Sequence, residues 1–92
     1  MNQIWKYELG PSGTTTICMP KNAVVLYVAE QDKKVCLWAL IQGGAQTVER
    51  SFRIVLTGEP FGADLYLYIG TVMLGGGSYV CHVFECYPGE RS

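Results

Sequence analysis

The sequence predicts an all-β domain of about seven strands, folded as a small sandwich or a curled barrel with at most one short helix. Apolar residues alternate with polar ones, or form short runs, in segments bounded by Gly, Pro and Asn, which is typical of strands. No window keeps the apolar period of a helix over the ~10 residues that a helix assignment needs. The 92 residues, 49% of them hydrophobic and 16% charged, suffice for one core. Residues 1–92 are therefore interpreted as a single β domain.

The first three predicted strands are separated by residues that form turns. Residues 4–9 alternate between an apolar and a polar face, as a half-buried strand does. The segment 10–13 contains a proline and two glycines and predicts a turn. Residues 14–18 are rich in β-branched side chains and predict a second strand that ends before Met19-Pro20. After a further turn, the apolar run 23–29 predicts the third.

The next two predicted strands follow a hairpin loop and a glycine-containing break. Residues 34–41 follow a polar hairpin loop at 31–33 and pair with the third strand. Residues 47–57 alternate again, and one of their faces is apolar and predicted to join the core: Phe52, Ile54 and Leu56.

The last two predicted strands form a hairpin. Residues 66–74 and 78–86 flank three glycines at 75–77, which predict a tight turn. These glycines are not a phosphate-binding loop, because neither the Gly-Lys-Ser/Thr sequence nor a helix follows them. The one short helical turn is expected at 63–65, and residues 87–92 are expected to form a frayed tail.

Four of the predicted strands are apolar on both faces: 23–29, 34–41, 66–74 and 78–86. On 66–74, strict alternation places Tyr68 on the same face as Val72. A sandwich of this size should instead leave its outer faces polar. The simplest cover for a second apolar face is another copy of the chain, so we expect a homo-oligomer.

Charge and composition exclude several classes of protein. Seven Lys and Arg against eight Asp and Glu give a net charge of −1, too balanced for a protein that binds long nucleic acid through many phosphates. No apolar run reaches the ~20 residues of a membrane helix, and no signal peptide is recognisable. The four cysteines form no C-x-x-C pair and are expected to be reduced, buried thiols of a cytoplasmic protein: Cys18, Cys36, Cys81 and Cys86.

The sequence gives no support for catalysis, a metal or a cofactor. His82 is the only histidine, and its neighbour Cys81 points to the opposite face of the same predicted strand, so the two cannot pair. The carboxylates are scattered, without the spacing of a metal site or an acid–base pair. We therefore predict a protein that is not an enzyme, in which His82 is either a structural residue or a ligand contact.

The cations offer candidate anion contacts. Arg53 lies opposite the apolar face of 47–57, so its guanidinium is expected to be available for a phosphate. Lys6 projects from the polar face of 4–9. Lys21 occupies the turn after Pro20, where its backbone N–H is also expected to be free.

The aromatic residues offer candidate stacking contacts. The chain has two Trp, six Tyr and three Phe, and most of these must fill the core. Trp38 and Tyr68 are the candidates for stacking on a nucleotide base, with His82 as a polar contact. Together with Arg53 they suggest a nucleotide site at a subunit interface; the alternative is that they are core aromatics beside solubilising charges.

Several short segments resemble a known family through their order and spacing: Ile4-Trp5-Lys6-Tyr7, Met19-Pro20-Lys21-Asn22-Ala23, Cys36-Leu37-Trp38-Ala39-Leu40, Arg53-Ile54, Thr57-Gly58, Tyr68-Ile69-Gly70-Thr71 and His82-Val83-Phe84-Glu85. The family is one of short phage-encoded domains of about this length, and the resemblance spans nearly the whole chain. Each segment alone is unspecific. Asn22 stands where a glycine is expected, which affects only a turn.

The resemblance implies a role in evading bacterial immunity. Some small phage proteins of this kind are anti-CBASS sponges, which sequester a cyclic oligonucleotide signal in the host cytoplasm without cleaving it. By analogy, the expected partner is a cyclic dinucleotide or a related small nucleotide. The alternative is a protein-interaction inhibitor that caps a host defence enzyme through exposed strand edges and apolar faces.

Overall fold

The computed structural model describes residues 1–44, 46–62 and 66–86. Seven strands and one 3-10 turn, η2 (Gly75–Gly77), make up the fold. The strands are β1 (Asn2–Glu8), β2 (Gly13–Pro20), β3 (Val24–Gln31), β4 (Lys34–Gln42), β5 (Thr47–Leu56), β6 (Tyr66–Leu74) and β7 (Tyr79–Cys86). This confirms the predicted all-β class. The expected helical turn at 63–65 and the expected tail at 87–92 lie outside the described residues.

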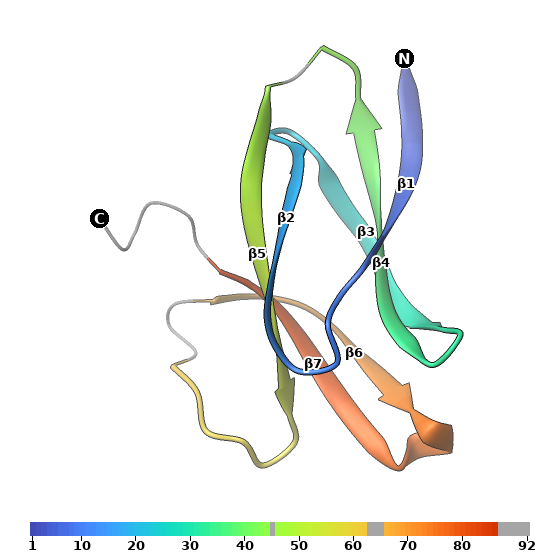
Figure 1. Ribbon diagram of the computed structural model, residues 1–92, viewed down its shortest axis with the longest axis vertical. Helices are drawn as coiled ribbons and strands as arrows, with labels where there is room; N and C mark the ends of the chain where they lie inside the picture. Colours follow the sequence, from blue (N-terminus) through green and yellow to red (C-terminus); the bar gives the residue numbers. More distant parts are fainter. Residues whose placement is uncertain (45, 63–65, 87–92) are drawn as a thin grey trace.

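The strands form two antiparallel sheets (Figure 1). One has three strands in the order β1-β4-β3, and the other has four in the order β2-β5-β7-β6. The chain passes from one sheet to the other after β1, β2 and β4, so neighbours in sequence often lie in different sheets. Pro20 is the last residue of β2, which is an edge strand, and strand prolines are found mainly on such edges.

Each of the two hairpins, β3–β4 and β6–β7, is closed by a tight turn with positive φ angles. Asp32 and Lys33 join β3 to β4 with positive φ angles of 54° and 66°, the backbone shape of a two-residue hairpin loop. The predicted loop was one residue longer, because Gln31 pairs with Lys34 as the last rung of the ladder. At the β6–β7 turn, all three glycines of η2 have positive φ, which side chains disfavour.

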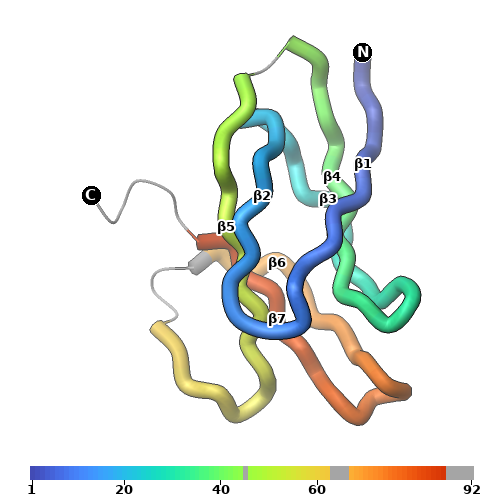
Figure 2. Tube along the Cα trace, viewed as in Figure 1, coloured from blue at the N-terminus to red at the C-terminus, as the bar shows by residue number. Residues whose placement is uncertain are grey.

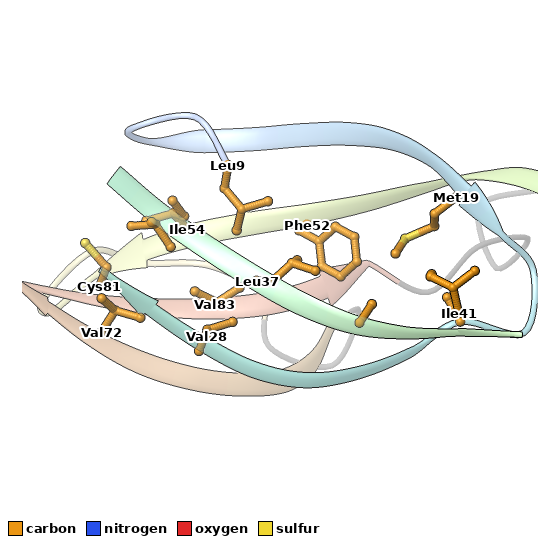
Figure 3. Close-up of a cluster of buried hydrophobic side chains, with 13 residues drawn as sticks. Leu9, Met19, Val28, Leu37, Ile41, Phe52, Ile54, Val72, Cys81 and Val83 are labelled. Carbon is orange, nitrogen blue, oxygen red and sulfur yellow. The ribbon is translucent and has the colours of Figure 1, made fainter. Parts of the chain in front are cut away.

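The core lies between the two sheets (Figure 3). It is built from Leu9, Met19, Ala23, Val28, Val35, Leu37, Ala39, Ile41, Phe52, Ile54, Val72, Cys81 and Val83. Phe52 and Ile54 lie in it as predicted. Leu56, expected beside them, is partly exposed at the end of the sandwich. Cys36 and Cys81 are buried free thiols whose pKa is raised by burial, whereas the prediction was wrong for Cys18, which is exposed on edge strand β2.

Each sheet contains a bulge that breaks the alternation. In β6, Tyr68 pairs with Phe84 but Gly70 pairs with Val83, so Ile69 is an extra residue between them. Tyr68 therefore shares the outer face with Thr71 and not the inner face with Val72, and the predicted arrangement was wrong. In β3 the register shifts in the same way between Val25 and Tyr27.

The outer face of the three-stranded sheet is apolar. Register places Ile4 beside Leu40 and Val24, and Trp38 beside Tyr27. Three of these side chains are at least half exposed: Ile4 at 61%, Val24 at 50% and Tyr27 at 65%. The two-faced strands expected at 23–29 and 34–41 are thus present. This outer face, called the Trp38 face below, is uncovered in the single chain. Within the described residues no helix is long and apolar enough to cross a membrane.

Candidate ligand-binding surface

The outer face of the four-stranded sheet brings three of the predicted site residues together. Phe84 on β7 lies between Arg53 on β5 and Tyr68 on β6, since it is the cross-strand partner of both. His82 lies two residues before Phe84 and therefore on the same face. We call this set the Phe84 surface: Arg53, Tyr68, Thr71, His82 and Phe84.

Aromatic rings form the middle of the Phe84 surface. The rings of Tyr68 and Phe84 meet edge-on with their centroids 5.5 Å apart. Phe61, from the segment that follows β5, packs on Phe84 at 4.8 Å. Tyr68 is 55% exposed, so it is the ring of this surface that a flat ligand such as a base can contact.

A chain of hydroxyl groups fixes the His82 ring. Its Nε2 lies 2.8 Å from Thr57 Oγ1, and its Nδ1 lies 3.1 Å from Thr71 Oγ1. The Tyr68 hydroxyl lies 2.5 Å from the same Thr71 oxygen. In a neutral imidazole one ring nitrogen donates and the other accepts, so these hydroxyls orient the ring. As predicted, Cys81 faces the other way, into the core.

Arg53 is already engaged by a carboxylate. Its Nη2 donates to Glu59 Oε2 at 3.1 Å, and Glu59 Oε1 accepts the backbone N–H of Leu56 at 3.1 Å. The Leu56 N–H, and secondly Arg53, lower the pKa of Glu59 below its ordinary value. The expectation that the Arg53 guanidinium is available was therefore wrong, because Glu59 binds it, and an anionic ligand would compete with this carboxylate.

The remaining predicted site residues lie elsewhere. Lys6 and Trp38 are cross-strand partners on the other sheet. The Lys6 ammonium donates to Gln31 Oε1 at 2.5 Å, and the ring centroids of Trp38 and Tyr27 are 6.2 Å apart. Lys21 lies at one end of the sandwich. Its backbone N–H donates to the Gln46 carbonyl at 2.7 Å, so the prediction of a free N–H was wrong.

Two residues of this arrangement, Phe84 and Glu59, were not among the predicted site residues. Phe84 could have been found, since alternation puts it on the face of His82. Glu59 could not, because its position depends on how the loop after β5 folds back. Across the residues that the structure places, no three His, Cys, Asp or Glu side chains are grouped as a metal site would require.

Comparison with known proteins gives the family of the chain. A family model described as a domain of unknown function, DUF7352, matches residues 1–92. Comparison with curated proteins and with solved structures gave no match. Because the family model covers the whole chain, the protein belongs to the DUF7352 family.

Proposed function

We propose that this protein binds and sequesters a small phosphate-bearing nucleotide, of the cyclic oligonucleotide class, without cleaving it. The observation that carries the proposal is the Phe84 surface, which combines a guanidinium, the exposed ring of Tyr68 and oriented hydroxyls on one sheet face. A phosphate takes charge-assisted hydrogen bonds from a guanidinium. A base stacks on an aromatic ring. Sequestration needs no acid or base, only these contacts.

The cyclic class and the setting come from the resemblance to phage-encoded domains. We propose on this basis that the protein acts in the cytoplasm of an infected bacterium, where a sponge would lower the free concentration of an immune signal. We assign the phosphate to Arg53, the base to Tyr68 beside Phe84, and a ribose or base polar group to His82 and Thr71. Lys6 and Trp38 lie on the other sheet, and Lys21 is bonded to Gln46 at the far end of β5 from Arg53. We therefore do not assign these three residues to the same ligand in one chain.

The direct test is a thermal-shift panel. Cyclic dinucleotides, cyclic trinucleotides and linear nucleoside monophosphates are added separately to the purified protein. A ligand that binds only the folded state raises the Tm. We expect a rise with at least one cyclic compound, and recovery of that compound intact after heat release. A panel without any shift contradicts nucleotide binding, and linear products would contradict sequestration without cleavage.

The Arg53→Ala variant should bind such a nucleotide about 2 kcal/mol more weakly, which is the loss of a charged hydrogen bond. The binding constant would be measured by calorimetry. Lys34→Ala is the matched control, because it removes one exposed cation from the other sheet and changes the net charge equally. Equal affinity of the two variants would contradict the role of Arg53.

The Glu59→Gln variant should bind the nucleotide more tightly, by severalfold. The amide keeps an acceptor for the Leu56 N–H but no longer competes with phosphate for the Arg53 guanidinium. The gain should disappear when Arg53 is also replaced by Ala. If Glu59→Gln tightens binding equally in both backgrounds, the competition between Glu59 and phosphate is refuted.

A second candidate function is inhibition of a host defence protein through the Trp38 face. The observation that favours it is the exposure of Ile4, Val24 and Tyr27 on one sheet, since contiguous apolar surface marks interaction sites.

The same face could pair with a second copy. We expect the purified chain to elute above monomer size at micromolar concentration, and Tyr27→Glu to return it to a monomer. Elution of the parent protein as a monomer would contradict self-association.

A further inference from the structure

Three connections lie at one end of the sandwich: the segment after β1, the β3–β4 hairpin and the β6–β7 turn (Figures 1 and 2). Residues of all three line a cleft there. It consists of two adjoining hollows of about 320 Å³ and about 270 Å³, which share Pro11 and Leu74 in their walls. The Phe84 surface contributes no residue to either hollow.

The floor of the cleft belongs to the core. Leu9 and Val35 line the first hollow and Cys81 lines the second, and all three are buried members of the core cluster. Figure 3 shows Leu9 and Cys81 directed into the space between the sheets. Leu56 and Tyr79, both exposed, stand at the mouth of the second hollow. Apolar walls of this kind favour an aliphatic group over water.

The rim of the first hollow carries net positive charge. Lys33 and Lys34 both line it, together with Glu8. Glu8 lies 3.5 Å from the Lys34 ammonium and so balances one of the two cations. No carboxylate of the described residues lies within ion-pair distance of Lys33. The hairpin loop holds Lys33 at the rim with a φ of 66°.

Size and charge together restrict the occupant. A hollow of about 320 Å³ lies at the small end of the ~300–1,000 Å³ range of ligand pockets, so it suits a single chain and not a bulky lipid. A cation beside an apolar cleft complements an aliphatic chain that ends in an anion. We propose that this cleft binds a medium-chain aliphatic carboxylate, with the chain on Leu9, Val35 and Leu74 and the carboxylate at Lys33.

The binding test uses decanoate with the full chain, compared with decanol and decyltrimethylammonium. Calorimetry should give saturable binding for decanoate, weaker binding for decanol and the weakest for the cation. Octanoate should bind more weakly than decanoate, by roughly threefold to fourfold for each methylene that leaves the cleft. Absence of saturation, or equal binding of the three head groups, would overturn the proposal.

Two variants and the backbone amide NMR shifts caused by decanoate test the location of the site. Leu74→Trp fills the shared wall and should abolish binding, while Lys33→Asn, which tolerates the left-handed backbone, should weaken decanoate at least threefold and leave decanol unchanged. Lys6→Gln on the Trp38 face is the matched charge control and should bind normally. Backbone amide NMR shifts should change near Val35, Leu74 and Tyr79. Shifts confined to the Trp38 face, or full binding by a folded Leu74→Trp variant, would contradict the assignment.

Discussion

Replacing Glu85 by Ala should lower the free energy of unfolding by about 3–5 kcal/mol, because it leaves a buried arginine without its partner. Arg50 and Glu85 face each other from β5 and β7 on the core side of the four-stranded sheet. Their side chains are only 13% and 11% exposed. The guanidinium donates twice to the carboxylate, at 2.7 Å and 2.9 Å, and once to the Ala23 carbonyl at 2.7 Å. The hydrogen bonds that Arg50 donates to Glu85 raise the pKa of Arg50. A guanidinium does not lose its proton in proteins even without such a partner, so Glu85→Ala leaves a charged arginine behind.

The loss of unfolding free energy in Glu85→Ala would be measured by urea unfolding and compared with two other variants. Glu8→Ala breaks an exposed ion pair, with side chains 58% and 54% exposed, and should cost less than about 1 kcal/mol. Arg50→Met combined with Glu85→Leu removes both charges and should be much less destabilising than Glu85→Ala alone. If Glu85→Ala lowered the free energy of unfolding no more than Glu8→Ala, the buried Arg50–Glu85 pair would have no special role in stability.

The inward position of both residues of this ion pair follows from the alternation that predicted the strands. Arg50 precedes Phe52 by two residues and Glu85 follows Val83 by two, so each belongs to a core face. Their opposite charges are what make such inward positions tolerable. The strand pattern itself was predicted well because six of the seven strands, β2 to β7, contribute buried residues to the core, although β1 contributes none. Periodicity therefore carries both the fold class and most inward side chains.

The bulges, the assignment of strands to the two sheets and the grouping of the site residues depend on contacts that periodicity does not encode. Each bulge adds one residue, and from that point the two faces exchange, which is why Tyr68 joined Thr71 and not Val72. Sheet membership is also hidden, since β1, β2 and β3 are consecutive yet lie in alternating sheets. Consequently Arg53 and Tyr68 could be nominated separately, but their meeting at Phe84, and the separation of Trp38 from both, required the strand order.

The bulge in β6 also brings Gly70 against the other sheet. A Cβ built on Gly70 would lie 2.6 Å from Val28 Cγ2, well inside van der Waals contact. The φ angle of Gly70 is not positive, so its small size is required by this approach and not by its backbone conformation. Val28 is a buried core residue with a branched, stiff side chain that cannot swing away. The two sheets therefore approach most closely where β6 passes β3.

Gly70→Ala should consequently destabilise the fold by about 3 kcal/mol, at the upper end of the range for overpacking. Val28→Ala alone should cost about 2 kcal/mol for its lost methyl groups. Because Val28→Ala also removes the atom that blocks the new methyl, the double variant should be more stable than the sum of the two losses by at least about 1 kcal/mol. Gly43→Ala is the matched control: its nearest contact would be 3.9 Å away, and a change within about 0.5 kcal/mol is expected. Strict additivity of the two substitutions in urea unfolding would show that Gly70 is not needed for the contact between β6 and β3.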